Sequence, residues 1–154
     1  MPLRVFEGIA DLKSCVGQEV GISDWFVITQ AQINAFAEVT QDRQWIHVDA
    51  DRAKGESPFG TTIAHGFLTL SLLSHLHAQA VELHGDFKMA INYGLNRVRF
   101  ASPVAAGARV RTCSTLQTVE DIPGGIQVLW LVRMEIEGHP KPALVAEWLV
   151  RFYF

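Results

Sequence analysis

The pattern of apolar residues in the first half of the chain is helical. Thr29 and Gln32 match a capping box, in which each side chain bonds the other residue's backbone amide. Residues at spacings of three and four then form one helical face, namely Ile33, Phe36, Ala37 and Thr40. This pattern predicts a helix that ends near Thr40 and leaves residues 42–47 on a loop. Asp49 follows, where an N-cap would start a further helical turn at Ala50.

The most apolar stretch of the chain runs from about His65 to Leu83. Its apolar residues occupy more than one helical face, and they are Phe67, Leu68, Leu70, Leu72, Leu73, Leu76, Ala80 and Leu83. A helix that is apolar nearly all round is expected to be buried. We therefore predict one long core helix over these residues.

The second half of the chain changes to the alternating pattern of strands. Strands are predicted over residues 89–100, 108–120, 126–137 and 143–154, with turns rich in Gly and Pro between them. Helices followed by antiparallel strands indicate an α+β fold, in which a curved sheet wraps the long buried helix. We expect residues 1–154 to form a single domain, and a dimer joined through the sheets would cover the remaining apolar surface.

Composition restricts the partners of the chain. The net charge is -3, with no basic stripe that would attract nucleic acid. The apolar run is interrupted by Ser71, Ser74 and His75, so we expect no membrane span. Two cysteines and an N-terminus without a long apolar segment indicate a cytoplasmic protein without a signal peptide.

Two short stretches carry most of the candidate chemistry. The first is the segment from Thr40 to Asp49, which contains a carboxylate, an imidazole and an indole within a few residues. The second is Ile63-Ala64-His65-Gly66, which opens the apolar helix. We expect these two stretches to face each other and form a site.

Taken together, these motifs resemble a known family. Asp42-x4-His47-x-Asp49 followed by Ile63-Ala64-His65-Gly66 resembles the MaoC-like R-specific enoyl-CoA hydratases. The segments 45–49, 62–67 and 91–100 are similar to the nodulation-protein-N-like branch of that family. The resemblance spans about residues 5–153 and implies a single hotdog domain and a homodimer. One departure is that Gln44-Trp45 stands where the common pattern has Asn-Pro, so the family does not specify the shape of this loop.

The resemblance implies hydration of a trans-2-enoyl-CoA to an (R)-3-hydroxyacyl-CoA, and the reverse dehydration. Asp42 and His47 would flank the attacking water as acid and base. Gly66, at a helix N-terminus, would offer its amide to the thioester oxygen. Ser74 would orient the pair or its water, while a buried serine bonded to its own helix is the alternative.

Two arginines of the first predicted strand are further candidates. Arg97 and Arg99 lie two residues apart, so they share one side of the strand. Their guanidiniums match the phosphates of coenzyme A, although a solvent-facing row of ion pairs is the alternative.

We expect neither a metal nor a cofactor. His75, His77 and His84 do not share ligand spacing, and no nucleotide-binding loop is present. Two other functions stay open, a hotdog acyl-CoA thioesterase and a non-catalytic acyl-CoA binding protein.

Overall fold

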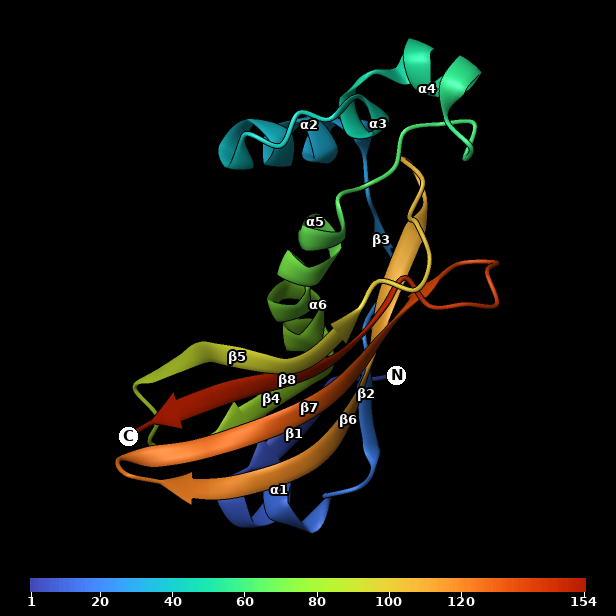
Figure 1. Ribbon diagram of the computed structural model, residues 1–154. Coiled ribbons are helices and arrows are strands. Elements are labelled where there is room, and N and C mark those ends of the chain that lie inside the picture. The colour runs from blue at the N-terminus through green and yellow to red at the C-terminus, as the bar shows by residue number, and fades with distance from the viewer.

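The computed structural model describes residues 1–154 as helices packed against a strongly curved antiparallel sheet (Figure 1). The helices are α1 (Ile9–Ser14), α2 (Gln30–Thr40), α3 (Trp45–Val48), α4 (Ala50–Glu56), α5 (Gly66–Ser71) and α6 (Leu73–Ala80). The strands are β1 (Arg4–Glu7), β2 (Glu19–Ile22), β3 (Phe26–Val27), β4 (Val81–His84), β5 (Met89–Arg99), β6 (Arg109–Ile122), β7 (Gly125–Ile136) and β8 (Leu144–Tyr153).

The main sheet has the strand order β2-β6-β7-β8-β5, and β3 also pairs with β6. Its inner face follows the predicted alternation, since Val110, Thr112, Ser114 and Leu116 are all fully buried. The α+β prediction is therefore confirmed. The four long strands agree with the predicted ranges to within a few residues.

The predicted single helix over residues 65–83 is wrong in two respects. It is interrupted at Leu72, which keeps right-handed helical dihedrals between α5 and α6. It also ends at Ala80, because residues 81–84 form a strand that pairs in parallel with β1. This pairing supplies backbone hydrogen bonds that the local apolar pattern does not reveal.

The burial of this helical segment is one-sided. Leu68, Leu73, Leu76 and Ala80 are buried against the sheet, whereas Phe67 is 69% exposed. The exposed side of α5, which includes Phe67, therefore remains an apolar surface of the protomer.

None of the helices combines the length and apolar character required to cross a bilayer.

The first motif, residues 40–49, connects α2 to α4 and includes α3, and these helices lie above the end of the sheet in Figure 1. The capping box at Thr29 and Gln32 is present and starts α2. Asp49 caps α4, with its Oδ1 accepting from the Arg52 amide at 3.0 Å. These caps fix where each helix begins, and so they position the residues between them.

Candidate active site

His47 lies on α3, a single helical turn, and not on the loop that the sequence predicted. Its side chain is buried, and its Nδ1 lies 2.7 Å from the carbonyl oxygen of Ile63. A carbonyl can only accept, so Nδ1 carries the proton and Nε2 keeps a free lone pair. Burial is the main cause that lowers the pKa of His47, and the charge of neighbouring His65 lowers it further. The ring is therefore neutral near neutral pH and can act as a base.

Two residues outside both motifs hold His47 in place. Gln30 donates from Nε2 to the His47 carbonyl at 2.7 Å, and Thr62 donates its hydroxyl proton to Gln30 Oε1. Sequence reasoning missed both. Gln30 shares a helical face with buried Ile33 and Ala37. A polar side chain on this apolar face was the sequence signal that could have identified Gln30.

His65 joins Asp42 to His47. Its Nε2 lies 2.9 Å from the Asp42 carbonyl oxygen and 4.0 Å from the Asp42 carboxylate. Its ring stacks on His47 with 3.8 Å between centroids. His65 therefore connects Asp42 to His47 through a hydrogen bond and ring packing.

Asp42 follows the C-cap of α2, where Gln41 adopts a left-handed conformation. Its side chain is 52% exposed, and its backbone carbonyl is fixed by His65. The ionisable atoms of Asp42, His47 and His65 lie within 4.8 Å of one another. One water molecule can therefore contact the carboxylate and the His47 ring together.

Such a trio could also be considered as metal ligands, but its geometry does not favour an ion. Imidazole lone pairs lie in the ring plane, and the planes of His47 and His65 are stacked only 23° from parallel. Lone pairs in stacked rings do not converge on one point, as metal coordination requires. The arrangement suits a bound water better.

Gly66 is the first residue of α5, and its N–H has no acceptor within the protein. Gly66 and His47 line the same pocket of about 280 Å³, together with Ile63, Thr69 and Phe100 among others. The free amide lies at the positive end of the α5 backbone. The pocket thus combines a neutral base with an unpaired donor.

Trp45 does not line this pocket. It is half-buried, and the Arg52 guanidinium lies over its ring at 4.3 Å from the centroid. The replacement of the usual Asn-Pro by Gln44-Trp45 therefore leaves the pocket unfilled by the indole.

The structure does not bring Ser74 to the pocket that contains His47. Ser74 is exposed and accepts from Asn92 Nδ2 at 3.3 Å. It lines a separate pocket beside Asn92 and Trp148. The alternative of a buried serine bonded to its own helix is not observed either.

Arg97 and Arg99 are exposed on β5 and line no pocket with His47. Arg99 donates only to the neighbouring Val98 carbonyl, at 2.8 Å.

Comparison with known proteins adds to this geometry. Residues 11–133 match the family described as MaoC like domain. The chain is 53% identical to 3-hydroxyacyl-thioester dehydratase Z of Mycobacterium tuberculosis (strain ATCC 25618 / H37Rv) over 97% of this chain and 99% of the relative. It is 48% identical to Nodulation protein N of Rhizobium meliloti (strain 1021) over 92% and 88% of the two chains. An (R)-hydratase from A. caviae involved in PHA biosynthesis superposes with a TM-score of 0.70 at 27% identity, covering 88% of this chain and 94% of the other.

Proposed function

The chain belongs to the MaoC-like dehydratase family and has its hotdog fold, and we propose that it is an R-specific hydratase of trans-2-enoyl-CoA. The coarser activity, dehydration of a 3-hydroxyacyl thioester, follows from relatives named for it. The observation that carries the finer proposal is the pocket itself. A neutral His47 lines one pocket with the free Gly66 amide, and a ring nitrogen of His47 lies within 4.8 Å of a carboxylate oxygen of Asp42.

The proposed reaction uses one water held between Asp42 and His47. The carboxylate accepts one hydrogen bond from the water and orients it, while His47 Nε2 accepts its other proton. The water oxygen bonds to Cβ of the enoyl group, and the π electrons move to the thioester oxygen. The Gly66 amide stabilises the resulting enolate charge. The imidazolium then returns the proton to Cα, which completes the addition of one water.

We also propose that the enzyme works as a homodimer. β5 is an edge strand of the sheet, and an unpaired edge is a template for another strand. Large apolar side chains are exposed on or beside it, namely Met89, Ile91, Tyr93, Leu95, Phe100 and Phe67. A second copy against β5 would bury this surface. We expect sedimentation equilibrium to give a molecular mass twice that of the protomer.

The free cysteines Cys15 and Cys113 fit our proposal that the enzyme works in the reducing cytoplasm.

An assay with crotonyl-CoA tests the proposed reaction. We expect loss of the enoyl-thioester absorbance, formation of (R)-3-hydroxybutyryl-CoA on a chiral column, and no release of free thiol. Free coenzyme A as the product would instead identify a thioesterase. Tight binding of crotonyl-CoA without turnover would identify a non-catalytic binding protein.

A further inference from the structure

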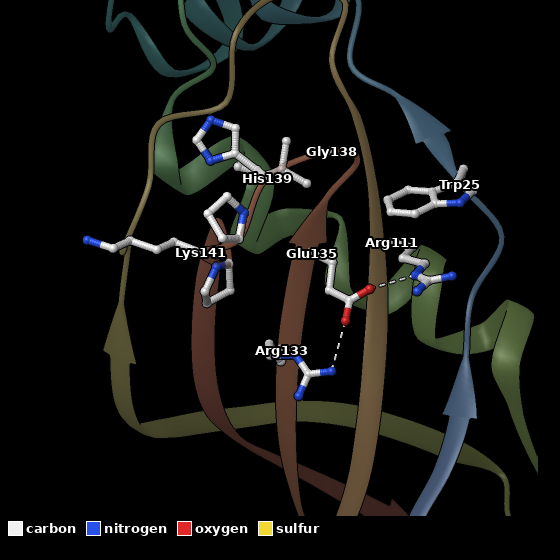
Figure 2. Close-up of a pocket in the computed structure, with 10 residues that line it drawn as sticks. Trp25, Arg111, Arg133, Glu135, Gly138, His139 and Lys141 are labelled. Atoms are coloured by element: carbon white, nitrogen blue, oxygen red, sulfur yellow. Dashed lines mark hydrogen bonds and ion pairs between the residues drawn. The ribbon is translucent and has the colours of Figure 1, made fainter.

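Another pocket, lined mainly by polar residues, lies on the outer face of the sheet, on the side away from the helices (Figure 2). Its volume is about 330 Å³. Side chains from β6 and β7 form its floor, Trp25 forms one wall, and the β7–β8 connection forms the other. The lining residues are Trp25, Arg111, Arg133, Glu135, Ile136, Gly138, His139, Pro140, Lys141 and Pro142.

Glu135 organises the two arginines of this pocket. Arg111 donates from Nε to Glu135 at 2.7 Å, and Arg133 donates from an Nη to the other carboxylate oxygen at 2.9 Å (Figure 2). The hydrogen bond from Arg111 is the main cause that lowers the pKa of Glu135. The carboxylate is therefore ionised and holds both guanidiniums in fixed orientations.

The pocket has an excess of positive charge and of hydrogen-bond donors. A guanidinium has five N–H donors, and Glu135 accepts one bond from each arginine. Lys141 also lines the pocket, with its ammonium turned away from the two arginines (Figure 2). After a rotamer change of this flexible side chain, three cations would face one carboxylate, in a chain whose net charge is -3. Such a pocket favours an anion.

The shape of the donor set indicates which anion. Planar guanidiniums match the geometry of phosphate oxygens, and an ammonium adds a point charge. The Arg111 guanidinium also lies 4.5 Å from the centre of the Trp25 ring, which fixes a flat wall. Pro140 and Pro142 also line the pocket and add apolar surface. A phosphate attached to a flat base would use both kinds of surface.

The β7–β8 connection links this pocket to the one that contains His47. Pro142 lines the cationic pocket, and the next residue, Ala143, lines the pocket with His47 and Gly66. The Ala143 amide is anchored to the Met134 carbonyl at 2.8 Å, so this connection is fixed at the end of the sheet. A single elongated ligand that crosses the connection would reach both pockets.

We infer that the pocket between Trp25 and Lys141 binds the phosphorylated nucleotide end of the coenzyme A that carries the acyl group. This inference rests on the proposed function, because it places the thioester beside Gly66. It assigns the carrier to coenzyme A through Arg111, Arg133 and Lys141, in place of Arg97 and Arg99.

The test compares crotonyl-CoA with crotonyl-pantetheine, which has the same thioester and no phosphate. Arg133→Ala and Lys141→Ala should each raise the KM for crotonyl-CoA by about tenfold, as expected for a charge-assisted hydrogen bond. Neither should change kcat, and neither should change the KM for crotonyl-pantetheine. Arg4→Ala is the matched control, because Arg4 is equally exposed and ion-paired, with Asp11, on a strand of the other, smaller sheet. It should change neither KM.

A merely structural role for these ion pairs predicts equal effects on both substrates, or no effect on either, and each of those results would overturn the inference. Calorimetric titration of wild type with coenzyme A and with pantetheine keeps the test independent of turnover. If no enoyl thioester is hydrated but coenzyme A binds more tightly than pantetheine and Arg133→Ala removes the difference, the proposed reaction fails and the pocket assignment stands. Equal affinities for the two would overturn the pocket assignment alone.

Discussion

Replacement of Gly66 by alanine separates the proposed role of its amide from simple packing. A Cβ at Gly66 would lie 3.1 Å from two ring carbons of Phe100 and 3.2 Å from a third. Ordinary carbon contacts begin near 3.4 Å, so the ring or the helix must move by a few tenths of an ångström. The new methyl would also stand between the free amide and the approaching thioester.

The expected loss follows from the geometry of the amide. Loss of one oxyanion donor costs about 10²–10³-fold in kcat, and a displacement of about 1 Å in a reacting group costs about 10²-fold. The methyl hinders the amide without removing it, so we expect kcat for crotonyl-CoA to fall by about 10²-fold. The free energy of unfolding should change by less than about 1 kcal/mol, because alanine favours a helix and the crowding opposes that gain.

The assay compares steady-state hydration by Gly66→Ala with that by Gly55→Ala. Gly55 is also helical, and a Cβ there would meet nothing within 4 Å. Gly55→Ala should keep wild-type kcat. Adding Phe100→Ala to Gly66→Ala relieves the crowding but leaves the methyl in the path of the substrate, so activity should stay low. Wild-type kcat in Gly66→Ala, or full rescue by Phe100→Ala, would refute the reasoning about the amide.

Three further predictions concern pH and stability. Burial lowers the pKa of His47, so protonation should abolish kcat/KM only below the ordinary histidine value of about 6.5; an acid limb centred above that value would contradict a buried neutral base. Burial also lowers the pKa of His77 to about 4, so the unfolded chain binds its proton first and stability falls as pH drops from about 6.5 towards 4. Between about pH 7 and pH 5, the free energy of unfolding of His77→Gln, measured by urea titration, should therefore fall by about 2 kcal/mol less than that of wild type. Equal losses of unfolding free energy would show that His77 does not resist protonation. Asp49→Ala removes the cap of α4 and should cost about 1 kcal/mol of unfolding free energy with kcat/KM unchanged; a large loss of activity would mean that Asp49 acts in the site.

The fold could be predicted where the signal was local and periodic. The Thr29–Gln32 capping box and the alternation along β6 and β7 are properties of neighbouring residues, and both are present in the structure. The end of the long helix could not be predicted, because residues 81–84 become a strand only through pairing with β1. The helical turn at Trp45–Val48 was also missed, since four residues carry no usable period.

The motifs identified Asp42, His47 and Gly66 as candidate reacting groups, and their roles stay a prediction. In the structure His47 and Gly66 line one pocket, and a carboxylate oxygen of Asp42 lies within 4.8 Å of a ring nitrogen of His47. The residues that support these groups could not be predicted. The supports act across long sequence separations, as in the bond from Gln30 to the His47 carbonyl. The role of Ser74 stays a prediction. Its hydrogen-bond partner, Asn92, belongs to a different element, β5, so the sequence could not indicate this contact.

In the proposed homodimer, Arg97 and Arg99 would lie at the interface between the two copies. Both are exposed on the edge strand that would meet the second copy. Their contact with coenzyme A also stays a prediction, and it competes with the pocket that contains Arg133 for the same phosphates.

The central claim is that Asp42 and His47 act together on one water, and a double-mutant cycle tests it most directly. The measured quantity is kcat/KM for crotonyl-CoA hydration by Asp42→Asn, by His47→Ala and by the double variant, with melting curves to confirm folding. We expect each single variant to lose at least about 10²-fold. The double variant should lose little more, because residues that act as a unit are strongly non-additive. Full activity in either folded single variant, or losses that multiply in the double variant, would contradict the account.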